Sequence, residues 1–381
     1  MKTDTVKGFK DYTGEEAEKR ASIKKVITYI FERYGFKPAE TPIIEYEEFV
    51  KGPESQSEDE AVSDIFKLKD KGNRKLALRY EFTFQLKRLM KNKKLPFKRY
   101  QIGEVFRDEP VTKNRLRQFI QCDADVIGSS VKDEAEILSL ARDILSNLGI
   151  KPIILINNRK LLNEILEDQG IKEKDKAKVL KELDKYDKLP EKEVKNNLKK
   201  YKAENILSSL KKGEKFFNQF PSYKEIISLK EYCKLYGVEV MFAPTMVRGL
   251  SYYNGSIFEI KAKGIKETIV AGGSFMFNNI QSTGISFGLD RISEIAKLKD
   301  SKEESYLVVS LGQDKKAIEI TQKLRIKGKI TSLFYGKPSK ALEYANSYKY
   351  SKVIFVGEKE VKSGKFKVKD MKTGKEKRLK I

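Results

Sequence analysis

This chain of 381 residues contains no histidine, and its only two cysteines, Cys122 and Cys233, lie far apart in the sequence. Without an imidazole the protein cannot form a Ser-His triad or a histidine-ligated metal centre, and two distant thiols do not make a structural zinc site. Any chemistry must therefore depend on arginine, lysine, carboxylates, tyrosine and bound ligands.

Long apolar segments are also missing from the sequence. No run approaches the roughly 18 apolar residues of a membrane span, and residues 1–12 hold no apolar signal segment. We therefore expect a cytoplasmic protein with no membrane partner. The chain has neither GxxxxGK[ST] nor GxGxxG, so neither a P-loop nor a dinucleotide fingerprint explains a nucleotide site.

Negative charge is in short supply, because 55 Asp and Glu residues stand against 78 Lys and Arg residues, which gives a net charge of +23. An excess of this size favours a polyanionic partner, nucleic acid first and an anionic membrane surface second. A lysine-rich composition throughout the source organism is the alternative explanation.

Hydrophobic periodicity predicts an α+β protein with more than one domain. Residues 1–152 mix helical and strand patterns, whereas residues 153–235 are Lys/Glu-rich and mostly helical, which indicates an insertion. Strand patterns resume over 236–300. After a charged linker at 299–305, alternating strands and helices over 305–381 predict a small α/β domain with a parallel sheet and an edge hairpin. Within the first part, the predicted elements are a helix over 15–34 ending at Gly35, a strand over 76–83 that enters a helix, strands over 97–107 and 116–128, and a helix over 133–148 ending at Gly149.

The strand predicted over 116–128 separates polar from apolar side chains by its period of two. An ordinary solvated antiparallel sheet shows the same pattern. The preceding strand favours a binding site instead, because Arg107 ends it and Glu109 follows in the loop. Arginine forks beside a flat ring suit the phosphates and base of a nucleotide. The polar face carries Arg117, Phe119, Gln121, Asp123 and Asp125, with Arg115 just before it; the apolar face carries Gln118, Ile120, Cys122, Ala124 and Val126.

Two further stretches place polar groups where a ligand could use them. In LALRYEFT, alternation puts Arg79, Glu81 and Thr83 on one face, and a carboxylate beside a hydroxyl suits an ammonium group. An exposed strand face is the plainer alternative. In GISFGLDR, small residues precede a helix that begins near Arg291, where backbone N–H groups and the arginine suit phosphate oxygens. A structural turn between strand and helix shows the same pattern.

Several stretches resemble known motifs. FRDEPVTKNRLRQF is similar to motif 2 of class II aminoacyl-tRNA synthetases, GISFGLDRI looks like motif 3, and YGFKPAETPIIE looks like motif 1. VRGLSYYNGSIFE resembles the stretch peculiar to histidyl-tRNA synthetases, and LALRYEFT, IQCDADVIG, INNRKLL and AGG agree with that family in its archaeal and eukaryotic style. The resemblance covers almost the whole chain. It implies a class II catalytic domain on an antiparallel sheet over 1–152 and 236–300, a helical insertion over 153–235, and an anticodon-binding domain over 305–381.

This family adenylates histidine with ATP and transfers it to the terminal adenosine of its tRNA. The resemblance therefore implies L-histidine, ATP and tRNA(His) as ligands, with Mg²⁺ bound through the ATP phosphates. It gives catalytic roles to Arg107 at the α-phosphate and to Arg248 at the α-phosphate and the substrate carboxylate. It assigns ATP binding to Arg107, Glu109, Arg115, Phe119 and Arg291, and histidine binding to Glu81, Phe82, Thr83, Gln121, Asp125, Tyr252 and Tyr253.

The resemblance also implies partners. Motif 1 segments form dimer interfaces in this class, so we expect a C2 homodimer. The lysine-rich insertion is placed to meet the acceptor arm of the tRNA through its phosphates, and the loop Asp108–Asn114 is expected to touch the first base pairs of the acceptor. For the insertion, a solvated charged helical domain is an equal alternative.

The chain departs from the family in two places. The family commonly continues Gly-Gly with Arg-Tyr-Asp, whereas the stretch Ala271–Met276, expected as a loop near the histidine pocket, has Ser274, Phe275 and Met276. Ser251 replaces an aspartate. Two alternatives to a synthetase stay open: a non-catalytic regulatory subunit of ATP phosphoribosyltransferase, and an RNA-binding or sensor module on the same fold.

Overall fold

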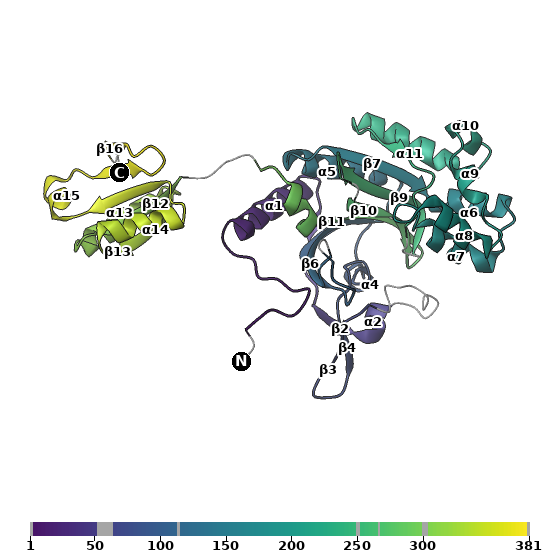
Figure 1. Ribbon diagram of the computed structural model, residues 1–381, viewed down its shortest axis with the longest axis horizontal. Coiled ribbons are helices and arrows are strands. Elements are labelled where there is room, and N and C mark those ends of the chain that lie inside the picture. The colour runs from purple at the N-terminus through teal and green to yellow at the C-terminus, as the bar shows by residue number, and fades with distance from the viewer. Residues whose placement is uncertain are drawn as a thin grey trace. The chain divides into compact units, whose positions relative to one another are not determined.

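A computed structural model describes residues 3–51, 64–112, 115–248, 252–265, 267–298 and 304–378. The chain divides into two compact units, Met1–Leu298 and Lys299–Ile381 (Figure 1), and each is described by itself. None of the helices in the described part of the chain combines the length and the apolar character that crossing a membrane requires.

The first unit is built on an eight-stranded sheet with the order β1-β5-β6-β11-β10-β9-β7-β8. Its inner pairs are antiparallel, and only the edge pairs β1–β5 and β7–β8 are parallel. The predicted α+β class with an antiparallel sheet is therefore confirmed. The strands are β1 (Lys37–Pro38), β5 (Phe97–Phe106), β6 (Gln118–Ile127), β7 (Pro152–Asn158), β8 (Met241–Phe242), β9 (Tyr253–Ala262), β10 (Thr268–Phe277) and β11 (Ile280–Gly288).

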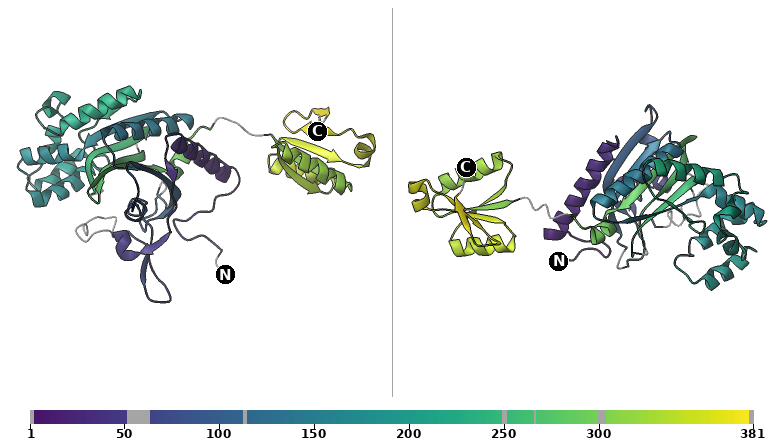
Figure 2. Two further views of the ribbon diagram at one scale, coloured as in Figure 1. Left: turned by 180° about the vertical axis from the view of Figure 1, so that it is seen from behind. Right: turned by 90° about the horizontal axis from the view of Figure 1, so that it is seen from above.

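Helices α1 (Gly14–Arg33) and α5 (Val131–Asn147) pack together and cover one face of this sheet, as Figure 2 shows from two further sides. The predicted apolar side of β6, with Cys122, Ala124 and Val126, is fully buried in the core that includes these helices. Because successive side chains of a strand point to opposite faces, the polar side chains of β6 lie on the other face. The short helix α12 (Leu289–Ile295) follows β11.

The helical stretch after β7 belongs to the same core as the sheet. Residue 153, the predicted start of the insertion, lies inside β7, which pairs with β9, and the helices begin at Arg159. Apolar side chains such as Leu161, Leu180 and Leu198 join the core of α1 and α5. The helices are α6 (Arg159–Asp168), α7 (Glu173–Leu183), α8 (Glu191–Lys199), α9 (Ile206–Leu210), α10 (Glu214–Phe217) and α11 (Tyr223–Leu235).

The strand predicted over 76–83 is shorter than expected. It ends at Leu78, and the following Arg79 is buried, where its guanidinium donates to the carbonyl oxygens of Glu104 and Thr41 at 2.6 and 2.8 Å. The helix expected after it is a single turn. These elements are β2 (Ile44–Tyr46), β3 (Lys67–Lys69), β4 (Lys75–Leu78), which form a sheet in the order β2-β4-β3, and helices α2 (Glu47–Lys51) and α4 (Leu86–Leu89).

The second unit is a three-layer α/β domain. Its sheet has the order β13-β12-β14-β15-β16, parallel among the first three strands and antiparallel in the last two pairs, which confirms the predicted parallel sheet with an edge hairpin. One core cluster contains α13 residues and the other contains α14 residues, so the two helices cover opposite faces. The elements are β12 (Ser305–Ser310), α13 (Asp314–Ile326), β13 (Ile330–Tyr335), α14 (Pro338–Ser347), β14 (Lys352–Val356), α15 (Glu358–Ser363), β15 (Lys367–Asp370) and β16 (Glu376–Arg378).

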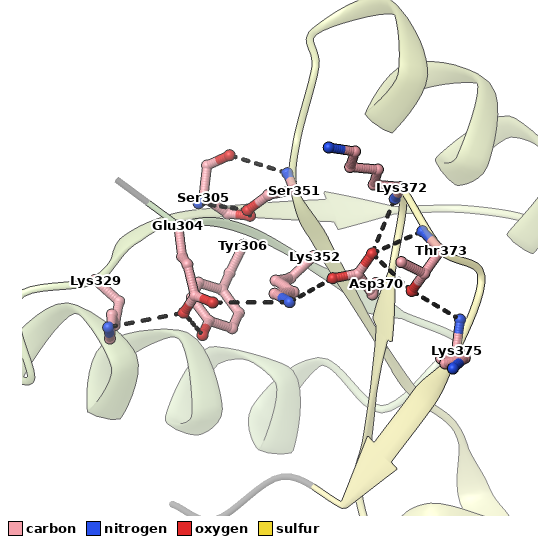
Figure 3. Close-up of polar contacts among 10 residues, drawn as sticks. All are labelled: Glu304, Ser305, Tyr306, Lys329, Ser351, Lys352, Asp370, Lys372, Thr373 and Lys375. Atoms are coloured by element: carbon pink, nitrogen blue, oxygen red, sulfur yellow. Dashed lines mark hydrogen bonds and ion pairs between the residues drawn. The ribbon is translucent and has the colours of Figure 1, made fainter. Parts of the chain in front are cut away.

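A polar network holds the hairpin of the second unit to the start of its first strand (Figure 3). Lys352 on β14 lies 2.6 Å from a carboxylate oxygen of Asp370 on β15 and 3.7 Å from one of Glu304. The Tyr306 hydroxyl donates to Glu304 at 2.8 Å. Asp370 also accepts from the backbone and hydroxyl of Thr373, which fixes the hairpin turn. The network therefore joins the edge hairpin to the first strand at the start of the domain.

Candidate active site

Polar side chains of β6 and β11 converge on a hollow of about 260 Å³. It lies on the polar face of β6, opposite α1 and α5. Its lining residues are Thr83, Asp123, Asp125, Tyr252, Tyr253, Ala271, Gly272, Gly273, Phe275, Gly284, Ile285 and Ser286.

Three buried carboxyl groups, those of Glu81, Asp123 and Asp125, lie in or beside the hollow. Burial raises the pKa of Glu81 and of Asp125. Burial and the neighbouring charge of Asp125 raise the pKa of Asp123 to about 7. A ligand that brings positive charge and N–H donors would stabilise these crowded carboxyl groups, because opposite charge favours their ionised form.

Asp125 is fixed between two neighbouring strands. On β5, the Nη2 atom of Arg99 lies 2.7 Å from Oδ2 of Asp125, and both residues are buried. On β11, a Cβ atom at Gly284 would overlap Oδ1 of Asp125, so the carboxylate occupies the space that any other residue would need. The sequence of β11 thus leaves room for the acid.

Two tyrosines form another wall of the hollow. The rings of Tyr252 and Tyr253 lie 4.8 Å apart, and the Tyr252 hydroxyl donates to Glu81 at 3.5 Å. Burial raises the pKa of both phenols. Both therefore stay protonated at neutral pH and can donate hydrogen bonds to a ligand.

The stretch Ala271–Met276 is not the loop that was expected but part of strand β10. Cβ atoms at Gly272 and Gly273 would collide with backbone oxygens of the flanking strands, so the strands approach closely only because these residues are glycine. Ser274 is buried, and Phe275 packs edge-on against Tyr252 at 5.9 Å. Of the altered residues, Phe275 lines the hollow, whereas Met276 is exposed.

The structure brings four predicted histidine-binding residues together, since Thr83, Asp125, Tyr252 and Tyr253 all line the hollow. The other three lie beside it. Glu81 is joined to Tyr252, Gln121 donates to Ser286 Oγ at 2.6 Å, and Phe82 is fully buried with its backbone oxygen bound by Arg99.

Arg107 follows β5 and lies between two aromatic rings. Its Cζ atom is 4.3 Å from the ring centre of Tyr80 and 5.1 Å from that of Phe119. Its Nη2 atom donates to Gln121 at 3.5 Å, while no carboxylate pairs with it in the described ranges. The rings hold the guanidinium in place and leave its charge available to an anion.

The other predicted phosphate-binding arginines lie close enough to repel one another. Burial lowers the pKa of Arg291, and the positive charges of Arg115 and Arg107 lower it further. Arg115 pairs with buried Glu109 at 2.7 Å, and Arg291 donates to the Thr268 carbonyl oxygen at 2.6 Å. Because the cluster gathers like charges, an anion with several oxygens would stabilise it.

Arg248 faces a protein carboxylate in this structure. Its Nη1 atom donates to Oε1 of Glu259 at 3.0 Å, and Oε2 of Glu259 accepts from the Thr268 hydroxyl at 2.7 Å. The adjoining Gly249–Ser251 lie outside the described residues, as do Lys113 and Asn114 of the predicted acceptor loop. The role of Arg248 toward a substrate carboxylate therefore stays a prediction.

Several residues of the hollow were missed by the sequence reasoning. Asp123 was placed on the polar face of its strand but given no role, although it shares that face with Gln121 and Asp125, and this spacing was the available signal. Ser286, whose hydroxyl donates to Asp123 at 2.5 Å, had no distinguishing signal. Arg99 reads as one more basic residue in FKRYQ.

The raised pKa of Asp123 predicts a pH-dependent gain in stability for Asp123→Asn. The unfolded carboxyl ionises near 3.8 and the folded one near 7. The contribution of this group to stability is therefore complete below pH 3.8 and is lost as the pH rises to 7. We expect the amide to raise Tm by roughly 2–5 °C at pH 8, with less than half of that gain at pH 5. Equal gains in calorimetry at the two pH values would contradict the assignment.

Comparisons with known proteins agree with this geometry. The family model described as "Histidyl-tRNA synthetase" matches residues 8–292, and the one described as "Anticodon binding domain" matches residues 305–381. Histidine–tRNA ligase 1 of Bacillus cereus is 34% identical over 419 residues, which cover 100% of this chain and 98% of the relative.

Solved structures share the fold. The crystal structure of histidyl-tRNA synthetase from Nostoc sp. PCC 7120 has a TM-score of 0.84 at 23% identity and covers 100% of this chain and 97% of its own. An ATP phosphoribosyltransferase regulatory subunit/histidyl-tRNA synthetase from Bacillus halodurans has a TM-score of 0.77 at 22% identity, over 93% of this chain and 98% of its own. At these identities the likeness shows the fold alone.

The sheet, its polar hollow and the α/β domain after it define the class II aminoacyl-tRNA synthetase fold. The chain belongs to the histidyl-tRNA synthetase family. The expected archaeal and eukaryotic style finds no support, because the curated relatives that match along the chain are bacterial.

Proposed function

We propose that this protein attaches L-histidine to tRNA(His) with ATP, by way of a histidyl-adenylate. The observation that carries the proposal is the adjacency of two sites of opposite charge. A hollow for an amino acid is lined by buried acids, and a hydrogen-bond path from Asp123 through Ser286 and Gln121 leads to Arg107. The charges of Arg107 and Arg115 both act on Arg291, and the three arginines would together bind the triphosphate.

The chemistry then needs positioning and charge neutralisation and no general base. The carboxylate oxygen of histidine attacks the α-phosphorus, and pyrophosphate leaves with the electrons of the broken P–O bond. Both reactants are anions, so cations held in place lower the barrier most. Arg107 would meet the α-phosphate, and Arg248, released from Glu259, would meet the substrate carboxylate. An enzyme without histidine can perform this reaction because a carboxylate is already nucleophilic.

Selectivity for histidine follows from pairing within the hollow. Asp125 and the hydroxyl of Tyr253 would take the two imidazole nitrogens, while Glu81, Thr83 and Gln121 would take the ammonium group. An amino acid without imidazole would leave buried Asp125 and Tyr253 unpaired, which costs about 1–3 kcal/mol for each group.

ATP would bring its own metal. The described residues contain no group of three His, Cys, Asp or Glu side chains able to hold an ion. Mg²⁺ would therefore be bound mainly through the phosphates, where it neutralises charge on the leaving pyrophosphate. Phe119, whose ring already stacks with Arg107, would pack on the adenine, and Glu109 would keep Arg115 in place.

The tRNA would be bound by its phosphates along basic surfaces. In residues 305–381, lysine and arginine outnumber aspartate and glutamate by more than two to one. In the helical insertion, Lys176, Lys211 and Lys230 pair with glutamates. The insertion can therefore equally be a charged helical region exposed to solvent or a surface that binds the acceptor arm of the tRNA. We place the protein in the cytoplasm, the compartment of translation.

A homodimer is also part of the proposal. Around the stretch that resembles motif 1, the side chains of Ile43, Ile44, Tyr46 and Leu68 are exposed, and three of them belong to the small sheet β2-β4-β3. Apolar side chains gathered at a surface are typical of a protein interface.

Histidine-dependent exchange of pyrophosphate into ATP tests the proposal, together with histidine charging of a tRNA(His) transcript. The regulatory-subunit alternative is not favoured, because the ligases match over the whole chain and an anticodon-binding domain is present. Such a subunit or an RNA-binding module would give no exchange.

Asp125→Ala should raise the KM for histidine at least tenfold, because the imidazole loses a buried acceptor, which is worth roughly 1–3 kcal/mol. The KM for ATP should stay within about twofold of wild type. An unchanged KM for histidine in the exchange assay would show that Asp125 does not bind the imidazole.

A further inference from the structure

We propose that Arg99, on β5, is the positioning residue that sets the distance between the two ends of the amino-acid site. This inference rests on the proposed function, since it concerns how the histidine pocket keeps its shape. Arg99 is the largest of the fully buried side chains and has no exposed surface, although it carries a permanent charge. A buried cation is costly, so its partners show what it does.

The first partner of Arg99 is Asp125 at the imidazole end of the pocket. The two residues stand directly opposite each other in the β5–β6 ladder, and Nη2 of Arg99 lies 2.7 Å from Oδ2 of Asp125. With Gly284 on the far side, Asp125 is confined between a guanidinium and a backbone. Its carboxylate is therefore held in the wall of the hollow that it lines.

The second partner belongs to the ammonium end of the pocket. The same Nη2 atom donates to the backbone oxygen of Phe82 at 2.9 Å. Phe82 stands between Glu81 and Thr83, in an irregular segment after β4 whose position no strand pairing fixes in the described structure. One nitrogen thus joins the segment that would hold the ammonium group to the acid that would hold the imidazole.

The other two nitrogen atoms of the Arg99 guanidinium, Nε and Nη1, have no hydrogen-bond partner among the described residues, and Arg99 is not one of the residues that line the hollow there. Arg99 therefore acts through Asp125 and Phe82, and its charge is committed to the pocket acids. A substrate that spans the two ends would fit only while this arginine holds both.

The test compares Arg99→Met with a matched control on the same strand. Lys98 is the next residue, and it pairs with Glu136 of α5 on the opposite face of the sheet, away from the hollow. In histidine-dependent exchange, Arg99→Met should raise the KM for histidine roughly tenfold or more with a smaller change in kcat. The KM for ATP in Arg99→Met, and both KM values in Lys98→Met, should stay within about twofold of wild type.

Two further variants separate positioning from simple loss of stability. Arg99→Lys keeps the charge but is shorter and lacks the planar guanidinium, so it should recover only part of the histidine affinity. If Arg99→Met does not fold, the KM for histidine of Arg99→Lys tests the proposal in its place. In an Asp125→Ala background, Arg99→Met should add less to the KM than it does alone, because one partner is already gone.

The proposal is overturned if Arg99→Lys, or a folded Arg99→Met, has the wild-type KM for histidine. It is also overturned if the KM values for histidine and ATP rise equally, which indicates general loosening of the sheet, or if the effects of Arg99→Met and Asp125→Ala are additive. A wild-type protein with no histidine-dependent exchange would refute the proposed function instead.

Discussion

Replacing Arg107 with alanine is expected to reduce histidine-dependent pyrophosphate exchange by roughly 10²–10³-fold, the usual cost of removing a charged group that stabilises a transition state. The reason is local. Arg107 is held by the rings of Tyr80 and Phe119 rather than by an acid, so its charge is available to an anion, which in the proposed reaction is the α-phosphate. The loss should appear in kcat at saturating histidine and ATP.

The stability of this variant should change little, because alanine at 107 removes no ion pair and relieves repulsion with Arg291. A matched control is Arg74→Ala, which loses the same charge from an exposed pair with Asp70 at the turn between β3 and β4. Exchange by the control should equal that of wild type. Near-wild-type exchange by Arg107→Ala would show that its guanidinium does not serve the reacting phosphate.

Removal of residues 299–381 should separate the two half-reactions. Residues 1–298 form a unit with its own continuous core and contain all the predicted ligand-binding residues, so exchange should stay within about threefold of wild type. Charging of tRNA(His) should fall roughly 100-fold or more in kcat/KM, because the truncated protein loses the basic domain that we propose contacts the tRNA phosphates. Equal losses in exchange and charging would mean that the C-terminal domain mainly stabilises the catalytic one.

The sequence predicted the architecture well where periodicity is strong. Helix α1 ends as expected before Gly35, whose φ of 80° lies in a region that favours glycine. The alternation along β6 correctly separated the side chains of the core from those of the polar face. The sequence predicted the structure less well where tertiary contacts determine the course of the backbone. The segment after Leu78 leaves its strand since Arg79 binds the backbone of two other segments, and no local pattern announces that.

The residues of the candidate site also differ in how well the sequence predicts them. Motif resemblance named Asp125, Tyr252 and Tyr253, which meet at the hollow although they come from distant parts of the chain. It could not find Arg99, because an arginine in a strand looks like a solvated residue until its cross-strand partner is known. The family comparison suggested a loop over Ala271–Met276, whereas this stretch belongs to a strand whose glycines 272 and 273 permit a close approach to its neighbours.

The absence of histidine from a chain that we propose binds histidine has a practical consequence for spectroscopy. In the nuclear magnetic resonance spectrum of the mixture, every ring signal of that kind comes from the added amino acid and none from the polypeptide. The protonation state and tautomer of the bound ring can therefore be followed across a titration without interference from histidine side chains of the protein.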